Sequence, residues 1–535
     1  MSLTSFRSNQ TAVNAFLAGS LAAALAWAGP AGTDFPAHLF QLDLFLKHGF
    51  ELWNNSWYAG RYTFVGYSIL YYPLAALIGI RLLAVLSIAA AAAAFTLLTR
   101  QTWGSSTVWA SRIFALVAGA SMLTAAFPYG LGLALALAAL VAVARGHLLG
   151  FAGLSALAFA ASPLAFLFAL VVLAAASLSR QRSEIVKPAA VAAAISAVGV
   201  VTSRLFPDPG HYPFQTSELL GVLGFCVAGA ALTWRVEQAR ILWRFFLLYG
   251  LICLISYAIP SNLGGDVTRL RLAAVPIAVL ALALRRWRPL PLAICVLALA
   301  TSWNVSPLAH DLLRSADDPS ASAAYWQPVI GFLQRSLTAS YRVEVVATAD
   351  HWEAVYVAGA GIPIARGWFR QDDFPENALL YGHLTRASYL GWLRRLGVRY
   401  VVLTDAALDY SSINEAALLR SGASRLPVVF RSAHATVFAV PSPEPIVTGP
   451  GRPRVESLSQ EAITVWLSRP GSYHLAVRYS PYFTAADGCV SKSSDGMTEL
   501  DALRAGTFRI GFAFSTSGAL AALTSSASVC QQATR

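Results

Sequence analysis

Side chains that could do acid–base chemistry gather after the first apolar segment, in residues 30–80. Asp34 and His38 are four residues apart, so a helix would place them on one face, and Asp43 follows closely. The carboxylate of Asp34 could deprotonate a hydroxyl group or hold a divalent metal ion, with His38 and Asp43 as supporting groups. The competing interpretation is structural: Asp34 would cap a helix beginning at Phe35, since Asp is a favoured N-cap and proline a favoured first-turn residue.

Aromatic side chains interleaved with polar ones follow directly downstream. The residues predicted to contact a sugar or an acceptor are Trp53, Asn54, Trp57, Tyr58, Arg61 and Tyr67. Aromatic rings offer flat apolar surfaces for stacking, while amide and guanidinium groups orient hydroxyls. Tryptophan and tyrosine are also enriched at membrane interfaces whatever the function, so an interfacial belt is an equal alternative.

Three arginines lie on the predicted outer side of the membrane, where basic residues are usually sparse. Arg269 and Arg271 follow a loop rich in glycine and serine, and Arg204 ends another apolar segment on the same side. Arginine binds phosphate groups bidentately, so these three are candidate ligands of a lipid phosphate. The competing interpretation is an ion pair with a nearby carboxylate, namely Asp34, Asp208 or Asp266.

The composition is typical of a multi-pass membrane protein. Hydrophobic residues make up 56% of the chain, charged residues only 12%, and the mean hydropathy is +0.56, whereas soluble domains carry roughly 25% charged residues. Crossing a bilayer takes about 20 apolar residues, and the long run at 149–178 is divided at Ser162-Pro163 because proline breaks helical hydrogen bonding. The eleven predicted segments are 12–29, 81–99, 107–126, 128–145, 149–161, 163–178, 186–205, 217–234, 241–259, 269–285 and 289–306.

The placement of basic residues predicts the orientation. With a cytoplasmic N-terminus, arginines and lysines gather in the inner loops, whereas the outer turns at 126–128 and 206–216 hold none. A cleavable signal is the alternative for the first segment and leaves residue 30 on the same side. We expect a multi-pass protein of the plasma (cytoplasmic) membrane whose C-terminal domains are extracytoplasmic. The net charge of +12 is largely this orientation signal, so no nucleic-acid binding is expected.

The predicted membrane domain, residues 1–306 with its outer loop at 30–80, is followed by an extracytoplasmic α/β domain at 307–440. Strand-like runs at 342–347 and 398–403 flank a helical stretch near 377–396, and this order indicates a small α/β fold.

A proline-rich linker at 441–445 opens the last predicted domain, 441–535. Runs of alternating hydrophobicity at 463–467, 473–479 and 508–512 are separated by turn residues, which is typical of a β-sandwich.

Five cysteines divide between the two predicted environments. Cys226, Cys253 and Cys295 fall in apolar segments, where a free cysteine behaves as a small hydrophobe. Cys489 and Cys530 fall in the exported portion, where disulfides persist, and we predict that they pair. No CxxC spacing supports a zinc or redox site.

The layout resembles the GT-C superfamily of integral-membrane glycosyltransferases over roughly residues 1–306. The resemblance rests on Asp34 in the first outer loop, the aromatic stretch leading into Tyr72-Pro73-Leu74, about eleven helices, the Arg269 loop and a large exported portion. This superfamily includes protein mannosyltransferases, oligosaccharyltransferases and mycobacterial-type arabinosyltransferases. One departure is that Phe35 follows Asp34, so the paired acidic motif of several branches is absent and no metal ligand set is predicted.

The resemblance implies an inverting transfer of a sugar from a polyprenyl-phosphate donor to an extracytoplasmic glycan or protein acceptor. Asp34 would be the base and Arg269 a donor-phosphate ligand; the donor is the only small molecule expected, and a divalent metal stays open. Two alternatives remain: a lipid or polysaccharide transporter or flippase, and a non-catalytic envelope-assembly protein. A transporter should show internal repeats and ionisable residues at mid-membrane.

Overall fold

A computed structural model of the protein describes residues 3–178, 181–208 and 210–524. The chain forms two compact units. The first comprises Met1–Phe35, Tyr67–Val200 and His211–Asp317, and the second comprises Pro36–Gly66, Val201–Gly210 and Asp318–Arg535. The predicted outer loop at 30–80 is therefore divided, because its middle part belongs with the C-terminal portion of the chain.

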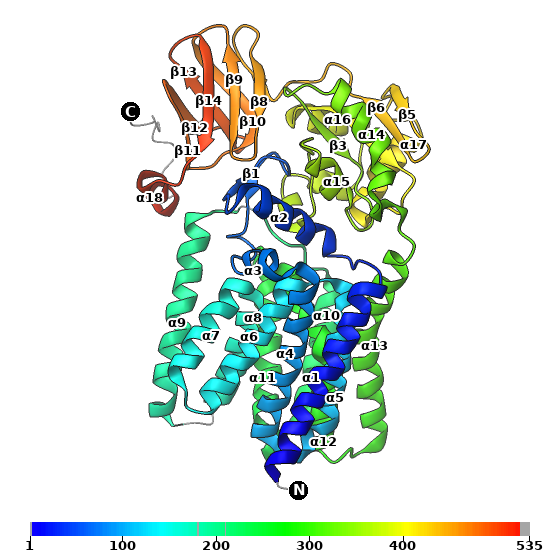
Figure 1. Ribbon diagram of the computed structural model, residues 1–535, viewed down its shortest axis with the longest axis vertical. Helices are drawn as coiled ribbons and strands as arrows, with labels where there is room; N and C mark the ends of the chain where they lie inside the picture. The colour runs from blue at the N-terminus through cyan, green and yellow to red at the C-terminus, as the bar shows by residue number, and fades with distance from the viewer. Residues whose placement is uncertain (1–2, 179–180, 209, 525–535) are drawn as a thin grey trace. The chain divides into compact units, whose positions relative to one another are not determined.

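Long apolar helices make up the first unit, and Figure 1 shows them running beside one another. Each of the eleven predicted segments overlaps a helix of the described chain, and one short helix, α3, is additional. The helices are α1 (Leu3–Ala28), α3 (Tyr71–Ile78), α4 (Ile80–Trp103), α5 (Val108–Ala120), α6 (Phe127–Ala144), α7 (Leu148–Ala161), α8 (Pro163–Ser177), α9 (Arg182–Leu205), α10 (Thr216–Thr233), α11 (Arg240–Ala258), α12 (Ala274–Leu284) and α13 (Leu290–Ser315).

Within the described residues, eight stretches are long and apolar enough to cross a membrane, and one of them, Ile80–Thr124, contains both α4 and α5. Helices α7 and α8 are apolar but shorter, and they meet at the predicted break, where the hydroxyl of Ser162 accepts a hydrogen bond from the backbone N–H of Ala165. Helix α13 continues past the predicted end at residue 306 although Pro307 lies inside it. The protein is thus a multi-pass membrane protein.

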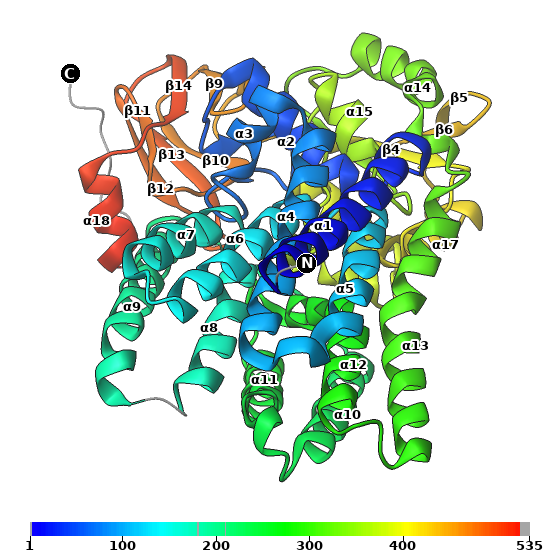
Figure 2. The same ribbon diagram turned by 60° about the horizontal axis from the view of Figure 1, so that its bottom comes forward.

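The core of the first unit centres on α12. Almost every side chain of this helix is buried, as expected for a helix that is apolar on all faces. Aromatic rings of α11 pack around it, with Phe245 and Tyr249 stacked at a centroid distance of 5.9 Å. Figure 2 shows α10, α11, α12 and α13 as neighbours in this part of the bundle.

The second unit contains a mixed four-stranded sheet with the order β3-β4-β6-β5. The two predicted strands are β3 and β4, which pair in parallel, whereas β6 pairs antiparallel with β4 and β5. The predicted helical stretch near 377–396 begins later, because Thr385 and Ser388 form a capping box that starts a new helix. The elements are β3 (Arg342–Val345), β4 (Val398–Thr404), β5 (Val428–Arg431), β6 (Ala435–Ala439), α14 (Ala323–Ser336), α15 (Glu353–Gly359), α16 (Arg386–Arg395) and α17 (Ile413–Arg420).

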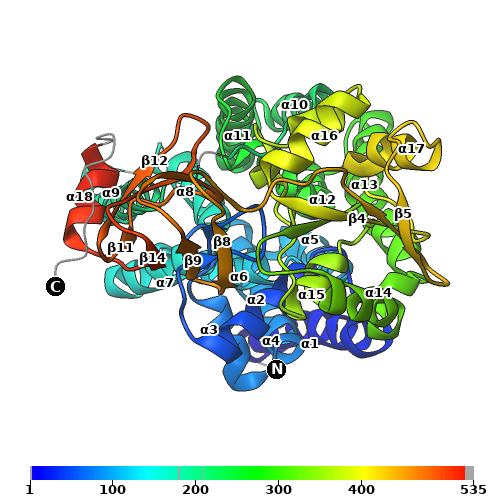
Figure 3. The same cartoon turned by 90° about the horizontal axis from the view of Figure 1, so that it is seen from above.

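Two antiparallel sheets form a β-sandwich in the same unit, seen beside the mixed sheet in Figure 3. Their orders are β12-β13-β10-β7 and β11-β14-β9-β8. The strands are β7 (Val447–Thr448), β8 (Arg454–Leu458), β9 (Ala462–Leu467), β10 (Gly471–Arg478), β11 (Phe483–Ala485), β12 (Gly488–Lys492), β13 (Met497–Ala502) and β14 (Gly506–Phe512), and helix α18 (Thr516–Thr524) follows. The predicted fold class, a helical multi-pass region followed by α/β and β-sandwich folds, is confirmed.

Residues 36–66 also belong to the second unit, with helix α2 (Phe35–His48) and a hairpin of β1 (Trp53–Asn54) and β2 (Arg61–Tyr62). The backbone N–H of Asn55 donates to the carbonyl of Gln460 at 3.0 Å, and that of Ile364 donates to the carbonyl of Ser56 at 2.9 Å. This segment therefore contacts both the sandwich and the α/β fold.

Candidate functional site

The carboxylate of Asp34 and the guanidinium of Arg269 meet in the first unit. Nη1 of Arg269 donates to Oδ2 of Asp34 at 3.3 Å, and Nε of Arg269 donates to Oδ1 of Asp266 at 2.9 Å. The side chains of Asp34, Arg269 and Asp266 are 14%, 21% and 26% exposed, so solvent reaches the cluster only in part. The predicted base and the predicted phosphate ligand thus lie side by side, with Asp266 as a second carboxylate.

A 3₁₀ helix, η4 (Gly264–Ala273), positions Arg269 and leads into α12. One turn of such a helix takes three residues, so Asp266 and Arg269 lie one above the other while Arg271 faces another direction. The first residue of η4 must be glycine: Gly264 has a φ of +37°, and a Cβ there would collide with the carbonyl oxygen of Tyr212.

Hydrogen bonds from α11 hold η4 in place. The hydroxyl of Tyr249 donates to the carbonyl of Val267 at 2.8 Å, and the hydroxyl of Ser256 donates to the carbonyl of Gly264 at 2.9 Å. Irregular backbone at membrane depth is tolerated where protein surrounds it and satisfies its polar groups. These bonds fix the backbone that carries Arg269.

Asp34 is held by the turn before α6. Its backbone N–H donates to the carbonyl of Thr124 at 3.1 Å, and the ring of Phe35 packs edge-on against Phe127 at 6.0 Å. Gly32 has a φ of +84°, and a Cβ there would press on the Cβ of Ala125. Asp34 immediately precedes α2, which is the position predicted for a helix cap, and its carboxylate also contacts Arg269. The capping position and the contact with Arg269 are therefore compatible.

Burial dominates the electrostatics of this cluster. It raises the pKa of Asp34 from 3.8 to about 6, an increase that Arg269 opposes and the charge of Asp266 supports. Burial also raises the pKa of the Tyr67 hydroxyl, with Arg269 again opposing. Tyr67 therefore lies within electrostatic reach of the cluster as a neutral hydrogen-bonding group. A carboxylate whose pKa is near 6 is suited to accept a proton close to neutral pH.

Arg271 lines a cavity of about 750 Å³ among α10, α12 and α13, called here the Arg271 cavity. Within the described chain its guanidinium makes no hydrogen bond or ion pair. His310 and Asp311 line the same cavity, and their side chains approach to 3.6 Å. The other walls are largely apolar, including Leu220, Phe225, Leu232, Phe246, Val296, Leu299 and Trp303. A cation in such surroundings favours an anion that carries an apolar chain.

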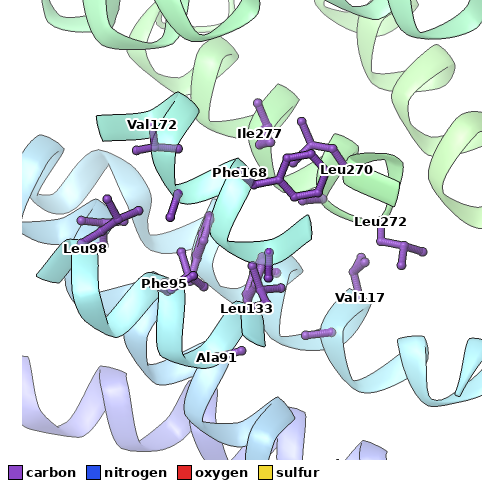
Figure 4. A pocket seen from close by; sticks show the side chains of 18 of the residues that line it. Ala91, Phe95, Leu98, Val117, Leu133, Phe168, Val172, Leu270, Leu272 and Ile277 are labelled. Atoms are coloured by element: carbon purple, nitrogen blue, oxygen red, sulfur yellow. The ribbon is translucent and has the colours of Figure 1, made fainter. Parts of the chain in front are cut away.

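A second, apolar cavity of about 170 Å³ borders the other side of η4. Figure 4 shows Phe95, Leu98, Leu133, Phe168, Leu270 and Ile277 around it. Thr124, whose carbonyl holds Asp34, lines it as well. Hydrocarbon is the only ligand class that these walls favour.

The predicted sugar-binding residues lie in the second unit, except for Tyr67. Trp57 is fully buried, stacks on Phe40 at 4.2 Å and donates from Nε1 to the carbonyl of Ala354. Asn54 is also fully buried and accepts a hydrogen bond from the backbone N–H of Ser56. Both side chains therefore hold the 53–62 segment in place.

Trp53, Tyr58 and Arg61 are also buried, but they line a cavity on one side. Nε of Arg61 donates to Oδ2 of Asp372 at 2.6 Å. Burial raises the pKa of Asp372 to about 7, and Arg61 opposes this increase.

The remaining predicted residues are dispersed. His38 is fully buried in α2, whereas Asp43 in the same helix is exposed and pairs with Lys47 at 2.7 Å. Arg204 is exposed in the last turn of α9. Cys489 lies in β12, but Cys530 lies outside the described residues, so their disulfide stays a prediction.

His310, Asp311 and Asp372 were not singled out from the sequence. The four-residue spacing of Leu308 and Leu312 continues the helical pattern past residue 306 and could have placed Asp311 at the end of a span. Asp372 lies in a short 3₁₀ turn between regular elements, where no spacing points to it.

Among the described residues, no three carboxylate, imidazole or thiolate side chains gather so as to hold a metal ion. In the cluster, the guanidinium of Arg269 already bridges the carboxylates of Asp34 and Asp266.

No family model matches the sequence, and no curated protein matches it. Among solved structures, the chain is similar to the arabinofuranosyltransferase AftD from Mycobacteria, with 16% identity and a TM-score of 0.45 over 82% of this chain and 40% of AftD. A mutant of the same enzyme gives 16% identity and a TM-score of 0.46 over 83% of this chain and 42% of the other. The chain thus spans about two fifths of the length of the AftD structures.

Proposed function

We propose that the protein is a GT-C-type glycosyltransferase that moves a sugar from a polyprenyl-phosphate donor to a glycan or protein acceptor, with inversion at the anomeric carbon. The observation that carries the proposal is the pairing of Asp34 with Arg269 at 3.3 Å. A carboxylate with a pKa near 6 can serve as the base, and the arginine beside it holds that carboxylate in place.

Arg271 is the proposed ligand of the donor phosphate. Arg269 is neutralised by two carboxylates, so its role is to position Asp34 and to limit the rise of its pKa. Arg271 makes no ion pair in the described chain, although the carboxylates of Glu218 and Asp311 lie within its electrostatic reach, and it lines a cavity whose other walls are largely apolar. An isoprenoid chain would occupy apolar surface there while the phosphate meets the guanidinium.

The reaction then needs one base and one stabilised leaving group. Asp34 takes the proton of the acceptor hydroxyl as the oxygen attacks C1 of the sugar. The bond from C1 to the phosphate oxygen breaks, and polyprenyl phosphate leaves with the electron pair beside Arg271. Because the leaving group is a good one, placement and charge neutralisation supply most of the acceleration.

The proposed step is written without a divalent cation, because Arg269 already pairs with both carboxylates. Transfer retained in excess chelator is the expected result. The proposed setting is the cytoplasmic membrane, with the N-terminus in the cytoplasm and both C-terminal folds outside it, as the distribution of basic residues predicts.

Substitution of Asp34 by Asn tests the base. Full-length protein in nanodiscs is supplied with radiolabelled polyprenyl-phosphate sugar and a glycan acceptor. We expect Asp34→Asn to lower the transfer rate by about 10²- to 10⁴-fold, the usual contribution of a general base. Transfer at the wild-type rate would reject the assignment. Flipping of the labelled lipid without any transfer would instead support a transporter.

Substitution of Arg271 by Ala tests the phosphate ligand. Binding of polyprenyl phosphate is measured directly, with Arg240→Ala as the matched control, because Arg240 is an exposed arginine that pairs only loosely with Glu237 at 3.8 Å. Arg271→Ala is expected to weaken lipid binding and Arg240→Ala to leave it unchanged. If Arg271→Ala bound polyprenyl phosphate as tightly as Arg240→Ala, Arg271 would not be the phosphate ligand.

A further inference from the structure

A polar cavity of about 590 Å³ opens in the second unit where the 53–62 segment, the sandwich and the 3₁₀ turn after Phe369 come together. We call it the Tyr479 cleft. Its lining is mainly polar and aromatic and includes Arg61, Asp372, Glu376, Arg478, Tyr479 and Lys492. The volume falls within the usual range for small-molecule sites.

The floor of the cleft is built before any ligand arrives. Arg61 and Asp372 form a buried ion pair at 2.6 Å, with side chains 8% and 6% exposed. Arg478 donates from Nε to the carbonyl of Tyr58 at 2.8 Å, and the guanidinium of Arg61 lies 3.9 Å from the ring centroid of Phe369. These contacts immobilise two guanidinium groups and a carboxylate at the base of an open space.

The rim offers groups that the protein does not use. Within the described chain, the side chains of Tyr479, Glu376 and Lys492 make no hydrogen bond or ion pair, and all three retain some exposure. Asp208 and Asp495 have partners, the N–H of Gly210 and the imidazole of His474, but each keeps free lone pairs. The rim therefore combines an aromatic ring with several directional donors and acceptors.

The balance of charge selects the class of ligand. Four carboxylates (Asp208, Asp372, Glu376 and Asp495) face three cations (Arg61, Arg478 and Lys492) in the lining. A phosphate or sulfate group would meet more carboxylates than free cations, and a cationic ligand would meet fixed guanidinium groups. A neutral ligand with many hydroxyls can use donors and acceptors of both signs at once.

We propose that the Tyr479 cleft binds a neutral oligosaccharide, with the ring of Tyr479 as a stacking surface and Glu376 and Lys492 as hydrogen-bonding partners of its hydroxyls. Its identification as the acceptor glycan rests on the proposed function, whereas binding itself does not. The buried Arg61 and Asp372 act as a fixed base on which the saccharide lies, which gives Arg61 a role among the aromatic residues of the 53–62 segment.

Binding is measured on full-length protein in nanodiscs with short neutral oligosaccharides of arabinose, mannose and glucose, by saturation-transfer NMR and titration calorimetry. At least one of them is expected to bind. Tyr479→Ala should weaken binding about tenfold or more, as expected for an anchoring aromatic side chain. Tyr479→Phe keeps the ring and should retain most of the affinity.

Two further variants guard against a folding defect. Glu376→Ala changes a half-exposed rim group and should also weaken binding, while Tyr410→Ala removes a tyrosine that is 51% exposed outside the cleft and should have no effect. The proposal would be overturned if no neutral oligosaccharide bound, or if inorganic phosphate bound in preference. Wild-type affinity in both the Tyr479→Ala and the Glu376→Ala variants would also overturn it.

The Asp34→Asn variant separates this proposal from the proposed function. It is expected to bind the oligosaccharide as the wild type does while losing transfer. If the wild-type protein binds the saccharide but transfers no sugar, the function fails and the cleft stands. If it transfers sugar with an unchanged acceptor KM in the Tyr479→Ala variant, the cleft fails and the function stands.

Discussion

The low-pH side of the pH–rate profile, called here the acid limb, should respond to the charges of Arg269 and Asp266 beside Asp34. If Asp34 is the base, only its deprotonated form reacts, and with a pKa of about 6 that form disappears as the pH falls below 6. We expect kcat/KM, which reports the free enzyme, to fall through a limb near pH 6. Asp266→Asn should move this limb to lower pH, and Arg269→Gln should move it to higher pH.

The magnitude follows from the geometry. The increase from 3.8 to about 6 corresponds to roughly 3 kcal/mol, at about 1.4 kcal/mol per pKa unit. Arg269 Nη1 lies 3.3 Å from Asp34 Oδ2, and even in bulk water unit charges at such a distance attract by about 1 kcal/mol. Loss of the guanidinium should therefore raise the limb by about one pH unit or more. Loss of the Asp266 charge acts in the opposite direction.

The assay is the initial rate of sugar transfer between pH 4.5 and 8 at low donor concentration, with the residual activity of each variant normalised to its own plateau. The donor is a phosphodiester and has no second ionisation, so its own titration does not contribute to the limb near pH 6. Displacement of the limb in the same direction by both variants would refute this assignment of charges. Absence of any limb near pH 6 in the wild type would refute Asp34 as the base.

Two predictions concern stability in the second unit, measured by thermal unfolding of the full-length protein. Trp57→Ala should lower the free energy of unfolding by about 3–5 kcal/mol, because a fully buried indole and its hydrogen bond to Ala354 are lost; a cost below about 1 kcal/mol would show that the ring is not packed as described. Arg366→Ala should cost about 3–5 kcal/mol, because the carboxylates of Glu344 and Glu415, each 2.6 Å from the guanidinium, are left buried without a cation. An unchanged Tm would show that these carboxylates are neutral in the folded protein.

The membrane part of the fold was predictable because its signal is local. Length and apolarity decide whether a segment becomes one of these helices, and Ser162-Pro163 marks a helix boundary by itself. The predicted segment at 289–306 ended too early, since α13 continues through Pro307, and a proline can lie inside a membrane helix when neighbouring groups satisfy the backbone.

The sequence predicted that Asp34 and Arg269 lie on the same side of the membrane, but it did not predict their contact. The distribution of basic residues placed both on the outer side, but the contact across 235 residues depends on the turn at Thr124 and on η4. The fate of the aromatic stretch was not predictable. Stacking on a sugar and packing in a core call for the same residue types, so the burial of Trp57 and the partial opening around Tyr58 require the three-dimensional arrangement.

A perturbed pKa does not by itself distinguish a reactive site from a structural one in this protein. In the α/β fold, burial lowers the pKa of His351, but its carboxylate neighbours Asp409 and Glu353 outweigh that effect and raise it to about 9. The network is as strongly perturbed as Asp34, and the charges in it satisfy one another.

What separates the two clusters is access. Neither cluster lines any of the cavities described above. The side chains of His351, Glu353 and Asp409 are only 9%, 4% and 3% exposed, whereas those of Asp34, Arg269 and Asp266 are 14%, 21% and 26% exposed. The η4 segment that carries Arg269 also has a cavity on each side. A buried ionisable cluster is structural when its charges neutralise one another and no ligand can reach it. It is suited to chemistry when a ligand can reach it. By this criterion we expect Asp34 to be reactive and His351 to be structural.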